Sequence, residues 1–344
     1  MKFSLSNPFT EDLAIDLGTV HTFIYARGRG MVVNEPSLVA VDIVTGDVVA
    51  VGAEALEMLG RSPEDVEVAY PMHEGVVADS KLAQKLLAKF VRKARGGRAR
   101  FSRRVILSVP SGITSVERSA IQGVVKSVGV SRVYLVEEGM AAAIGVKLPV
   151  TEGKASMVVD IGGGTTSIAV IANSGIVDSE TMRIGGLDMD IAIRNYVKQH
   201  YYVHIGDRTA ERMKMEIGSA TEPLEERKSL VKGQSLTKDG PAVVEVTSFD
   251  IHRSINGIVK QIVESVRRVL ERIPPEVASD VHDRGVVLTG GIALLAGMDA
   301  RIKVATSLDV SIAESPRQSV GRGAVALFDQ PLLLRRISRN IELT

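Results

Sequence analysis

The sequence of 344 residues contains no cysteine. Disulfide bonds, thiolate zinc sites and thiol nucleophiles are therefore excluded. It also lacks any run of about 18 apolar residues, so no membrane-spanning helix is predicted. The first ten residues lack the apolar segment of a secretory signal. We expect a cytoplasmic chain whose membrane contacts, if it makes any, are peripheral.

Aromatic residues and net charge are also scarce. Aromatic residues make up 4% of the chain, which argues against a surface that stacks the bases of single-stranded nucleic acid. The formal net charge is only +1, so bulk charge argues neither for nor against a nucleic-acid partner. We expect no such partner. The P-loop pattern Gly-x-x-x-x-Gly-Lys-Ser/Thr is absent, so a phosphate site would need another design.

Strands and helices alternate along a chain whose length suggests two domains. An apolar period of 3.6 residues predicts one helix over Ile255–Ile273, ended by Pro274, and another over Leu82–Phe90. Short apolar, β-branched segments predict strands at Leu13–Leu17, Phe23–Ala26, Val105–Val109, Val133–Val136, Met157–Ile161, Ser167–Ala172 and Val286–Leu288. This mixture indicates an α/β fold in which helices cover sheets.

Two of these strand pairs have similar sequences. Ile15–Thr19 reads Ile-Asp-Leu-Gly-Thr, and Val159–Thr165 reads Val-Asp-Ile-Gly-Gly-Gly-Thr. In both, an apolar strand ends in Asp and is followed by Gly, Thr and a second strand, which predicts two related halves. Glycine lets successive backbone N–H groups approach and surround an anion. The ordinary alternative is two hairpins with glycine turns.

The side chains at these turns suit phosphate binding. Thr19, Thr165 and Thr166 can add hydroxyl donors to the backbone amides. Asp16 and Asp160 would face the same phosphates and repel them. We therefore expect a divalent cation, Mg²⁺, that keeps most of its waters.

Three further segments carry candidate site residues. Val136–Ala143 runs from a strand into an Ala-rich helix, where Glu138 could activate an attacking water or simply favour the helix start. Leu288–Leu295 ends a strand in Gly-Gly before a predicted helix, which suits close approach to a base or phosphate. Glu211 and Lys214 share a helix face, and the ordinary interpretation is a surface ion pair.

These segments, in this order and at these distances, resemble the actin, sugar-kinase and Hsp70 ATPase superfamily, and within it the MreB family of bacterial actins. The resemblance extends from Leu13 to Phe328. The segments that carry the closer resemblance are Asn34–Ser37, Met140–Gly145, Val158–Thr166, Thr209–Gly218, Pro274–Glu276 and Leu288–Gly291. It implies an actin-like fold of two duplicated RNase H-like halves with a nucleotide cleft, and ATP and Mg²⁺ as cofactors.

The resemblance also implies four subdomains and a set of site residues. The implied subdomains are IA (1–32, 66–147 and 315–344), IB (33–65), IIA (148–182 and 246–314) and IIB (183–245). The implied phosphate contacts are Asp16, Gly18, Thr19, Val20 and His21, then Asp160, Gly162, Gly163, Gly164 and Thr165. The implied nucleoside contacts are Glu211, Arg212, Met213 and Lys214, then Gly290, Gly291, Ile292, Ala293 and Leu294. Glu138 matches the water-activating Glu and is expected to act with Thr166, while Asp16 and Asp160 would hold Mg²⁺ through water.

Several residues depart from the family pattern. Gly139 stands where Pro is usual, Ser167 where Glu is usual, and Ile292 where a third Gly is usual. Because a β-branched residue resists positive φ, we expect a reshaped adenosine loop at Ile292. The other departures are Val20–His21, Tyr70, His73 and Leu187. We expect ATP binding to be kept and hydrolysis to be weak.

The stretch from Ser80 to Val116 contains many Lys and Arg residues but no Asp or Glu. It could be a solvated surface, or it could bind nucleic acid, an acidic neighbouring subunit or anionic lipid. A Phe amid Arg favours the membrane, and the matching loop of the family inserts there. Arg98, Arg100 and Phe101 are therefore the predicted membrane contacts. Leu332–Ile337 is a weaker second candidate.

Two predictions concern other polar segments. His200 and His204 are spaced i, i+4, but no Glu lies between them and Tyr201–Val203 is predicted as strand, so we expect no zinc site. The polar stretch Ser219–Pro241 is predicted to be an exposed loop.

The resemblance implies a cytoskeletal protein whose ATP-bound form polymerises head to tail, with paired protofilaments. It further implies a location at the inner face of the membrane, control of cell shape, and contacts with the cell-wall elongation machinery and its membrane-protein adaptors. Three alternatives are a small-molecule kinase, an ATP-binding protein that does not polymerise, and an Hsp70-like module, for which we expect no peptide-binding segment after the ATPase core.

Overall fold

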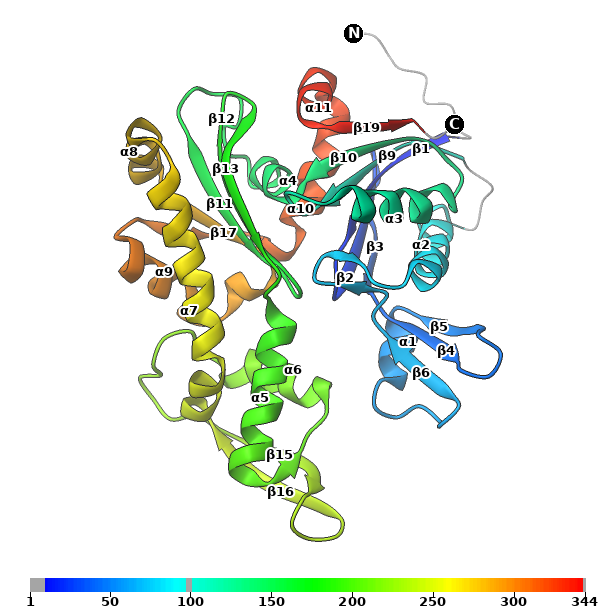
Figure 1. Cartoon of the computed structure of the whole chain (residues 1–344), viewed down its shortest axis with the longest axis vertical. Coiled ribbons are helices and arrows are strands. Elements are labelled where there is room, and N and C mark those ends of the chain that lie inside the picture. Colours follow the sequence, from blue (N-terminus) through cyan, green and yellow to red (C-terminus); the bar gives the residue numbers. More distant parts are fainter. Residues whose placement is uncertain (1–9, 97–100, 343–344) are drawn as a thin grey trace. The chain divides into compact units, whose positions relative to one another are not determined.

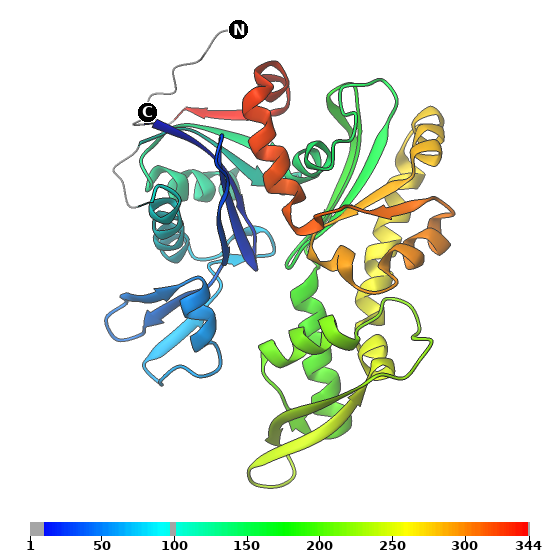
Figure 2. The same ribbon diagram turned by 180° about the vertical axis from the view of Figure 1, so that it is seen from behind.

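The computed structural model describes residues 10–96 and 101–342, and the chain divides into two compact units. Unit 1 comprises Met1–Lys154, Ile171–Val177 and Gln318–Thr344, and unit 2 comprises Ala155–Val170 and Asp178–Arg317. Each unit combines sheets with helices (Figures 1 and 2). The predicted α/β fold with helices on its sheets is confirmed.

Unit 1 is built on a six-stranded sheet of order β19-β10-β9-β1-β2-β3. Its strands are β1 (Thr10–Leu17), β2 (His21–Ala26), β3 (Gly30–Pro36), β9 (Phe101–Val109), β10 (Val130–Glu137) and β19 (Arg339–Glu342). β1 runs antiparallel to β2 and parallel to β9, which is parallel to β10. The strands predicted in this part of the sequence are confirmed.

Helices cover both faces of this sheet. Side chains alternate along a strand, so Leu13, Ile15 and Leu17 of β1 share one face, where they cluster with residues of α2 (Ser80–Ala94) and α3 (Ser115–Lys126). α2 begins where Asp79 accepts a hydrogen bond from the Leu82 amide, and it confirms the predicted helix. α10 (Ser319–Ala326) contacts β1, β2 and β9, and packs on α4 (Glu138–Gly145).

The packing of α4 on α10 depends on glycine. A β-carbon on Gly323 would lie 1.7 Å from the Ala141 carbonyl oxygen, and one on Gly145 would lie 1.8 Å from the Ser319 oxygen. The two backbones therefore touch directly at these residues. This contact fixes the helix whose first residue is Glu138.

A smaller sheet in unit 1 follows β3. β4 (Val39–Asp42) lies between β5 (Val48–Val51) and β6 (Val66–Ala69), and α1 (Ala53–Met58) covers it through Leu38, Ala40 and Ala55. β6 lies just past residue 65, where the family resemblance implies a subdomain boundary; the bounds of the four implied subdomains stay a prediction. A two-stranded sheet of β7 (Met72–His73) and β8 (Val76–Val77) comes next.

A five-stranded sheet of order β13-β12-β11-β17-β18 is the centre of the second half. Its strands are β11 (Ser156–Ile161), β12 (Thr166–Ala172), β13 (Gly175–Met182), β17 (Val286–Thr289) and β18 (Val310–Ile312). The accompanying helices are α7 (Ser248–Arg272), α8 (Pro275–Arg284) and α9 (Met298–Thr306). α7 starts in a capping box of Thr247 and Asp250 and stops just before Pro274, as predicted.

The two large sheets repeat one topology. The order β3-β2-β1-β9-β10 corresponds strand for strand to β13-β12-β11-β17-β18. The turn after the first strand is also the same in both: the Gly18 amide donates to the His21 carbonyl at 3.1 Å, and the Gly162 amide donates to the Thr165 carbonyl at 2.8 Å. The internal repeat predicted from the sequence is confirmed.

A third sheet corrects the prediction of a loop over Ser219–Pro241. β15 (Lys228–Ser235) pairs with β14 (Val203–His204) and β16 (Pro241–Thr247), beside α5 (Gly186–Tyr201) and α6 (Asp207–Ile217). Val231 and Val246 are fully buried on the inner face of this sheet. The sequence hides this strand because the inner face of β15 carries Ser229, Gly233 and Ser235 beside Val231, while Leu230 lies on the outer face, so apolar and polar residues do not alternate.

The strand predicted at Tyr201–Val203 is wrong for its first two residues, since β14 begins only at Val203. α5 continues through Tyr201, and Tyr202 ends it in the left-handed region at φ 55°. The Tyr201 hydroxyl donates to Asp250 at 2.6 Å, as does that of Tyr196 at 3.0 Å. These long-range hydrogen bonds favour helix over the strand propensity of the two tyrosines.

The remaining elements are short. They are the 3₁₀ turns η1 (Gly291–Leu294), η2 (Pro316–Gln318) and η3 (Leu327–Asp329), and the helix α11 (Pro331–Ile337). In the part of the chain that the structure describes, no helix has the length and apolar character to cross a bilayer.

Candidate functional site

The first glycine turn, Gly18–His21, joins β1 to β2 in unit 1. Ser37 braces it, because its hydroxyl donates to the Gly18 carbonyl at 2.7 Å and its amide donates to the Val20 carbonyl at 2.8 Å. Among residues 10–96 and 101–342, the amides of Thr19 and Val20 have no backbone acceptor. The buried Thr19 oxygen accepts from the Gly75 amide at 2.9 Å, so its hydroxyl proton can still be donated. This turn can therefore offer several donors to an anion.

Asp16 and His21 flank this turn. Because Leu17 faces α2 and α3, the alternation along β1 directs Asp16 to the other face of the sheet. Tyr25 lies on that face, where burial and the Asp16 charge raise its pKa to about 12. His21 stacks on Phe23 with ring centroids 5.7 Å apart.

Glu138 is the first residue of α4, directly after β10. The predicted passage from strand to helix is confirmed. A carboxylate at this position is stabilised by the helix dipole, and Glu138 is half-buried. Its role in activating water stays a prediction.

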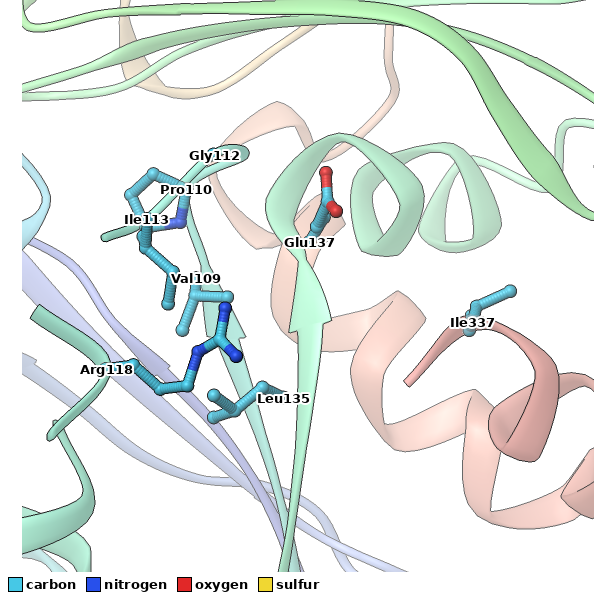
Figure 3. A pocket seen from close by; sticks show the side chains of 8 residues that line it. All are labelled: Val109, Pro110, Gly112, Ile113, Arg118, Leu135, Glu137 and Ile337. Atoms are coloured by element: carbon cyan, nitrogen blue, oxygen red, sulfur yellow. The ribbon is translucent and has the colours of Figure 1, made fainter. Parts of the chain in front are cut away.

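A pocket not predicted from the sequence lies beside this junction in unit 1 (Figure 3). Val109 and Leu135 form part of its apolar lining, and Arg118 and Glu137 are its charged residues. The Nε atom of Arg118 is buried and has no hydrogen-bond partner among the described residues. The two neighbouring glutamates at the end of β10 therefore have different surroundings. Glu137 lines this pocket, whereas Glu138 is the first residue of α4.

The second glycine turn, Gly162–Thr165, lies in unit 2. Its carbonyls at Gly162 and Gly163 accept from the amides of Gly186 (3.0 Å) and Leu187 (2.8 Å) at the start of α5. The amides of Gly163 and Gly164 have no backbone acceptor within the described residues. A β-carbon on Gly185 would lie 2.7 Å from both carbonyl oxygens, so only glycine allows this close packing. Gly185 and Gly186 were missed in the sequence; their signal is a Gly-Gly pair before a helix.

The residues on either side of this turn are buried. Asp160 accepts a hydrogen bond from Thr289 at 2.5 Å, and burial raises the pKa of its carboxyl to about 6. Thr166 is fully buried, and its hydroxyl donates to the Ile184 carbonyl at 2.9 Å. Thr166 therefore fastens β12 to the segment before α5, while its predicted catalytic role is untested. Within the described residues, no three acidic or histidine side chains group as a metal site.

The interpretation of Glu211 and Lys214 as a surface ion pair is wrong, because Lys214 is buried and pairs with Asp190. Lys214 is 7% exposed, and its ammonium donates to the Gly186 carbonyl and to Asp190, both at 2.8 Å. Burial raises the pKa of Asp190 to about 6, although Lys214 opposes the shift. Asp190, on α5, was also missed, since nothing in its sequence neighbourhood marks it as the partner of Lys214.

The segment Gly290–Leu294 completes the site in unit 2. Gly290 has φ 83°, and a β-carbon there would lie 2.2 Å from the Ile161 carbonyl oxygen. The helix predicted after the glycines is a short 3₁₀ turn. Ile292 does not have positive φ, as a β-branched residue favours, and the expected reshaping of the adenosine loop stays a prediction. The Ile292 side chain is buried and lies against Gly186.

The predicted site residues therefore form two sets. In unit 2, contacts join Asp160, the second glycine turn, Lys214 and the η1 segment around the start of α5. In unit 1, the first glycine turn and Glu138 lie at the ends of strands of one sheet. Both turns present backbone amides and glycine, which is the donor set that a phosphate chain requires.

The predicted membrane residues are largely untested. Arg98 and Arg100 lie outside the described residues, as does the side chain of Phe101. The preceding helix α2 exposes Lys81, Lys85, Lys89 and Arg92. Lys93 is exposed as well and is paired with Glu35. Leu332, in the second candidate segment, is 82% exposed.

Comparison with known proteins agrees with this geometry. A family model described as MreB/Mbl protein matches residues 10–335. The cell shape-determining protein MreB of Escherichia coli (strain K12) is 45% identical over 320 residues, 92% of each chain. The cell shape-determining protein Mbl of Bacillus subtilis (strain 168) is 38% identical over 322 residues, 93% of this chain and 96% of that protein.

Solved structures share the fold. MreB5 of Spiroplasma citri bound to ADP superimposes with a TM-score of 0.88 at 31% identity, covering 95% of this chain and 98% of that one. A MamK double helical filament is 22% identical with a TM-score of 0.78, over 93% of this chain and 99% of that one, and supports the fold alone. The chain therefore belongs to the MreB/Mbl family and has the actin-like fold.

Proposed function

We propose that this protein is a filament-forming, ATP-binding cytoskeletal protein that controls cell shape. The observation that carries the proposal is the repeated glycine turn, which occurs at the same topological position in both halves and in each leaves two amides without a backbone acceptor among the described residues. Relatives support it, since the matched Escherichia coli protein is named for cell-shape determination and Spiroplasma citri MreB5 binds ADP and AMPPNP.

The residues present fit a nucleotide with a cation. The amides of Thr19, Val20, Gly163 and Gly164 would bind phosphate oxygens. Asp160 is buried with a raised pKa, and a nearby cation would stabilise its charged form. We infer that Asp16 and Asp160 bind waters of a Mg²⁺ ion, which supplies charge neutralisation at the phosphates.

Glu138 is the proposed general base. At the start of α4 its carboxylate would orient the attacking water and accept its proton. Gly139 follows it where the family pattern has Pro, and glycine restrains a helix start less than proline does. We therefore propose slow hydrolysis, with Thr166 supporting the second turn.

The finer parts of the function are assembly and location. Head-to-tail contacts between identical subunits repeat without closing and so produce filaments, which we propose are paired. We propose a cytoplasmic protein attached peripherally to the anionic inner membrane through Arg98, Arg100 and Phe101. Its further partners would be the cell-wall elongation machinery and membrane-protein adaptors.

Sedimentation tests this proposal. Purified protein is pelleted with Mg-ATP or Mg-ADP, with and without vesicles of anionic lipid, beside the variant Phe101→Ala/Arg100→Glu. Lys238→Glu, which makes the same charge change to an exposed residue of the β15–β16 loop, is the control. We expect ATP-dependent pelleting that rises with vesicles and loses only that rise in the double variant. Tight ATP binding without pelleting would overturn the filament and leave a kinase or a non-polymerising ATP-binding protein.

A further inference from the structure

Ile292 and the ammonium group of Lys214 lie beside the same glycine at the nucleoside end of the proposed site. A β-carbon placed on Gly186 would lie 3.0 Å from Ile292 Cδ1 and 3.2 Å from Lys214 Nζ. Ile292 is 8% exposed and Lys214 is 7% exposed, so both side chains are shielded from solvent.

The charge of Lys214 is already matched inside the protein. Both carboxylate oxygens of Asp190 lie 2.8 Å from Nζ, and the Gly186 carbonyl accepts at the same distance. Gly186 in turn donates its amide to the Gly162 carbonyl of the second glycine turn at 3.0 Å. Lys214 thus ties α6 to α5 and, through Gly186, to the turn that would hold phosphate.

We propose that Ile292 sets the nucleotide affinity of this protein by keeping Lys214 from contact with the ligand. In this arrangement Lys214 is a positioning residue for the second glycine turn, and the ligand meets the Ile292 side chain instead of a cation. A smaller residue at this position would let the ammonium share its charge with a ribose or phosphate oxygen of the nucleotide. The inference rests on the proposed function, since it assumes a nucleotide beside η1.

The first test needs no ligand. Lysine acetylation followed by mass spectrometry measures how fast Lys214 reacts in wild type, in Ile292→Gly and in Ile292→Ala, each normalised to exposed Lys89 of the same molecule. We expect Lys214 to react slowly in wild type and severalfold faster in both variants. Ile312→Ala, which trims a half-exposed isoleucine of β18, is the matched control and should leave the rate unchanged. Unchanged Lys214 reactivity in correctly folded Ile292 variants would overturn the inference.

The second test measures the affinity for ATP and ADP by equilibrium dialysis. Because a hydrogen bond to a charged group contributes about 1.5 kcal/mol or more, we expect Ile292→Gly to bind about tenfold more tightly than wild type. The gain should disappear in Ile292→Gly/Lys214→Gln. Ile292→Ala should also bind the nucleotides more tightly than wild type. This variant keeps the test valid if glycine at position 292 unfolds the turn.

The outcomes separate the two proposals. Wild-type protein that binds neither nucleotide overturns the proposed function, and the affinity inference with it. Wild-type protein that binds, with Ile292 variants that bind equally or more weakly at an unchanged melting temperature, overturns the inference alone. A gain that persists without Lys214 also overturns it, because the ammonium would then not be the cause.

Discussion

At the scale of the residue, the buried Asp160 links stability to pH. Its carboxyl has a pKa of about 6 in the folded protein against 3.8 in the unfolded chain. The folded state therefore holds this proton to a higher pH, and the charged form destabilises the fold as pH rises from about 4 to 6. When no cation is bound, Asp160→Asn removes this pH-dependent loss of stability. The asparagine side-chain oxygen can still accept the hydrogen bond from Thr289.

We expect the free energy of unfolding of Asp160→Asn, minus that of wild type, to increase between pH 4 and 6 by at most about 3 kcal/mol and then stay constant. Denaturant titrations in EDTA at several pH values measure this difference. A difference that does not vary with pH would mean that Asp160 is ionised at low cost in the fold.

The Lys214–Asp190 pair gives a second prediction at this scale. Lys214→Met leaves a buried carboxylate without its cation, and breaking such a pair costs about 3–5 kcal/mol. We expect a loss of this order at pH 8 and a smaller one at pH 5, where Asp190 takes up a proton, its pKa being already raised to about 6. Lys214→Met/Asp190→Asn should recover most of the stability in thermal melts, and failure to recover would show that packing dominates.

The sequence predicted the two glycine turns, because their form is decided by residues close together in the chain. Glycine, threonine and aspartate at a strand end mark a turn that can bind an anion, and both turns have the geometry expected. Asp190, Gly185 and Gly186 could not be found in this way, because their importance comes from contacts with residues more than 20 positions away. The burial of Lys214 was missed for the same reason.

At the scale of the element, the direct contact of α4 with α10 is sensitive to a single methyl group. Gly323→Ala would place a β-carbon 1.7 Å from the Ala141 carbonyl oxygen, so the helices must separate. Such overpacking costs about 1–3 kcal/mol, and here the obstacle is rigid backbone. We expect the free energy of unfolding, measured by chemical denaturation, to fall by an amount at the upper end of this range. ATP hydrolysis should also be slower, because the proposed base Glu138 moves with α4.

Gly123→Ala is the matched control for that prediction. Gly123 lies inside α3 with no atom within 4 Å of its would-be β-carbon. Alanine in a helix interior is favoured over glycine by about 0.5–1 kcal/mol, so this variant should be more stable than wild type. Equal effects of the two substitutions would contradict the role given to the close helix contact.

Elements were predictable where pattern and propensity agree. The strands of both large sheets are apolar and β-branched, and α7 combines an apolar period of 3.6 residues with a capping box and a proline stop. β15 was missed because most of its inner face is Ser and Gly, so its pairing with β14 and β16 decides its conformation. The end of α5 was missed because Tyr196 and Tyr201 bind Asp250 from another helix. Long-range interactions decide both cases.

At the scale of the whole molecule, the division into two units predicts the course of unfolding. Chains with two domains commonly unfold in more than one step. We expect two calorimetric transitions without ligand. Gly123→Ala should raise the temperature of one of them, which identifies the transition of unit 1. A nucleotide held by both glycine turns is lost when either unit unfolds, so Mg-ATP at a concentration of 100 times Kd should stabilise the unit that unfolds first by about 2.7 kcal/mol. A first transition that Mg-ATP leaves unchanged would remove the glycine turn of that unit from the proposed site.

The hairpin of β15 and β16 also offers a practical advantage. Its connecting loop, residues 236–240, is exposed throughout, and the chain has no natural thiol. A single cysteine introduced there, as in Lys238→Cys, would be the sole attachment point for a fluorophore or spin label. One dye per subunit, placed outside both glycine turns, would report assembly in real time while leaving the proposed nucleotide contacts untouched.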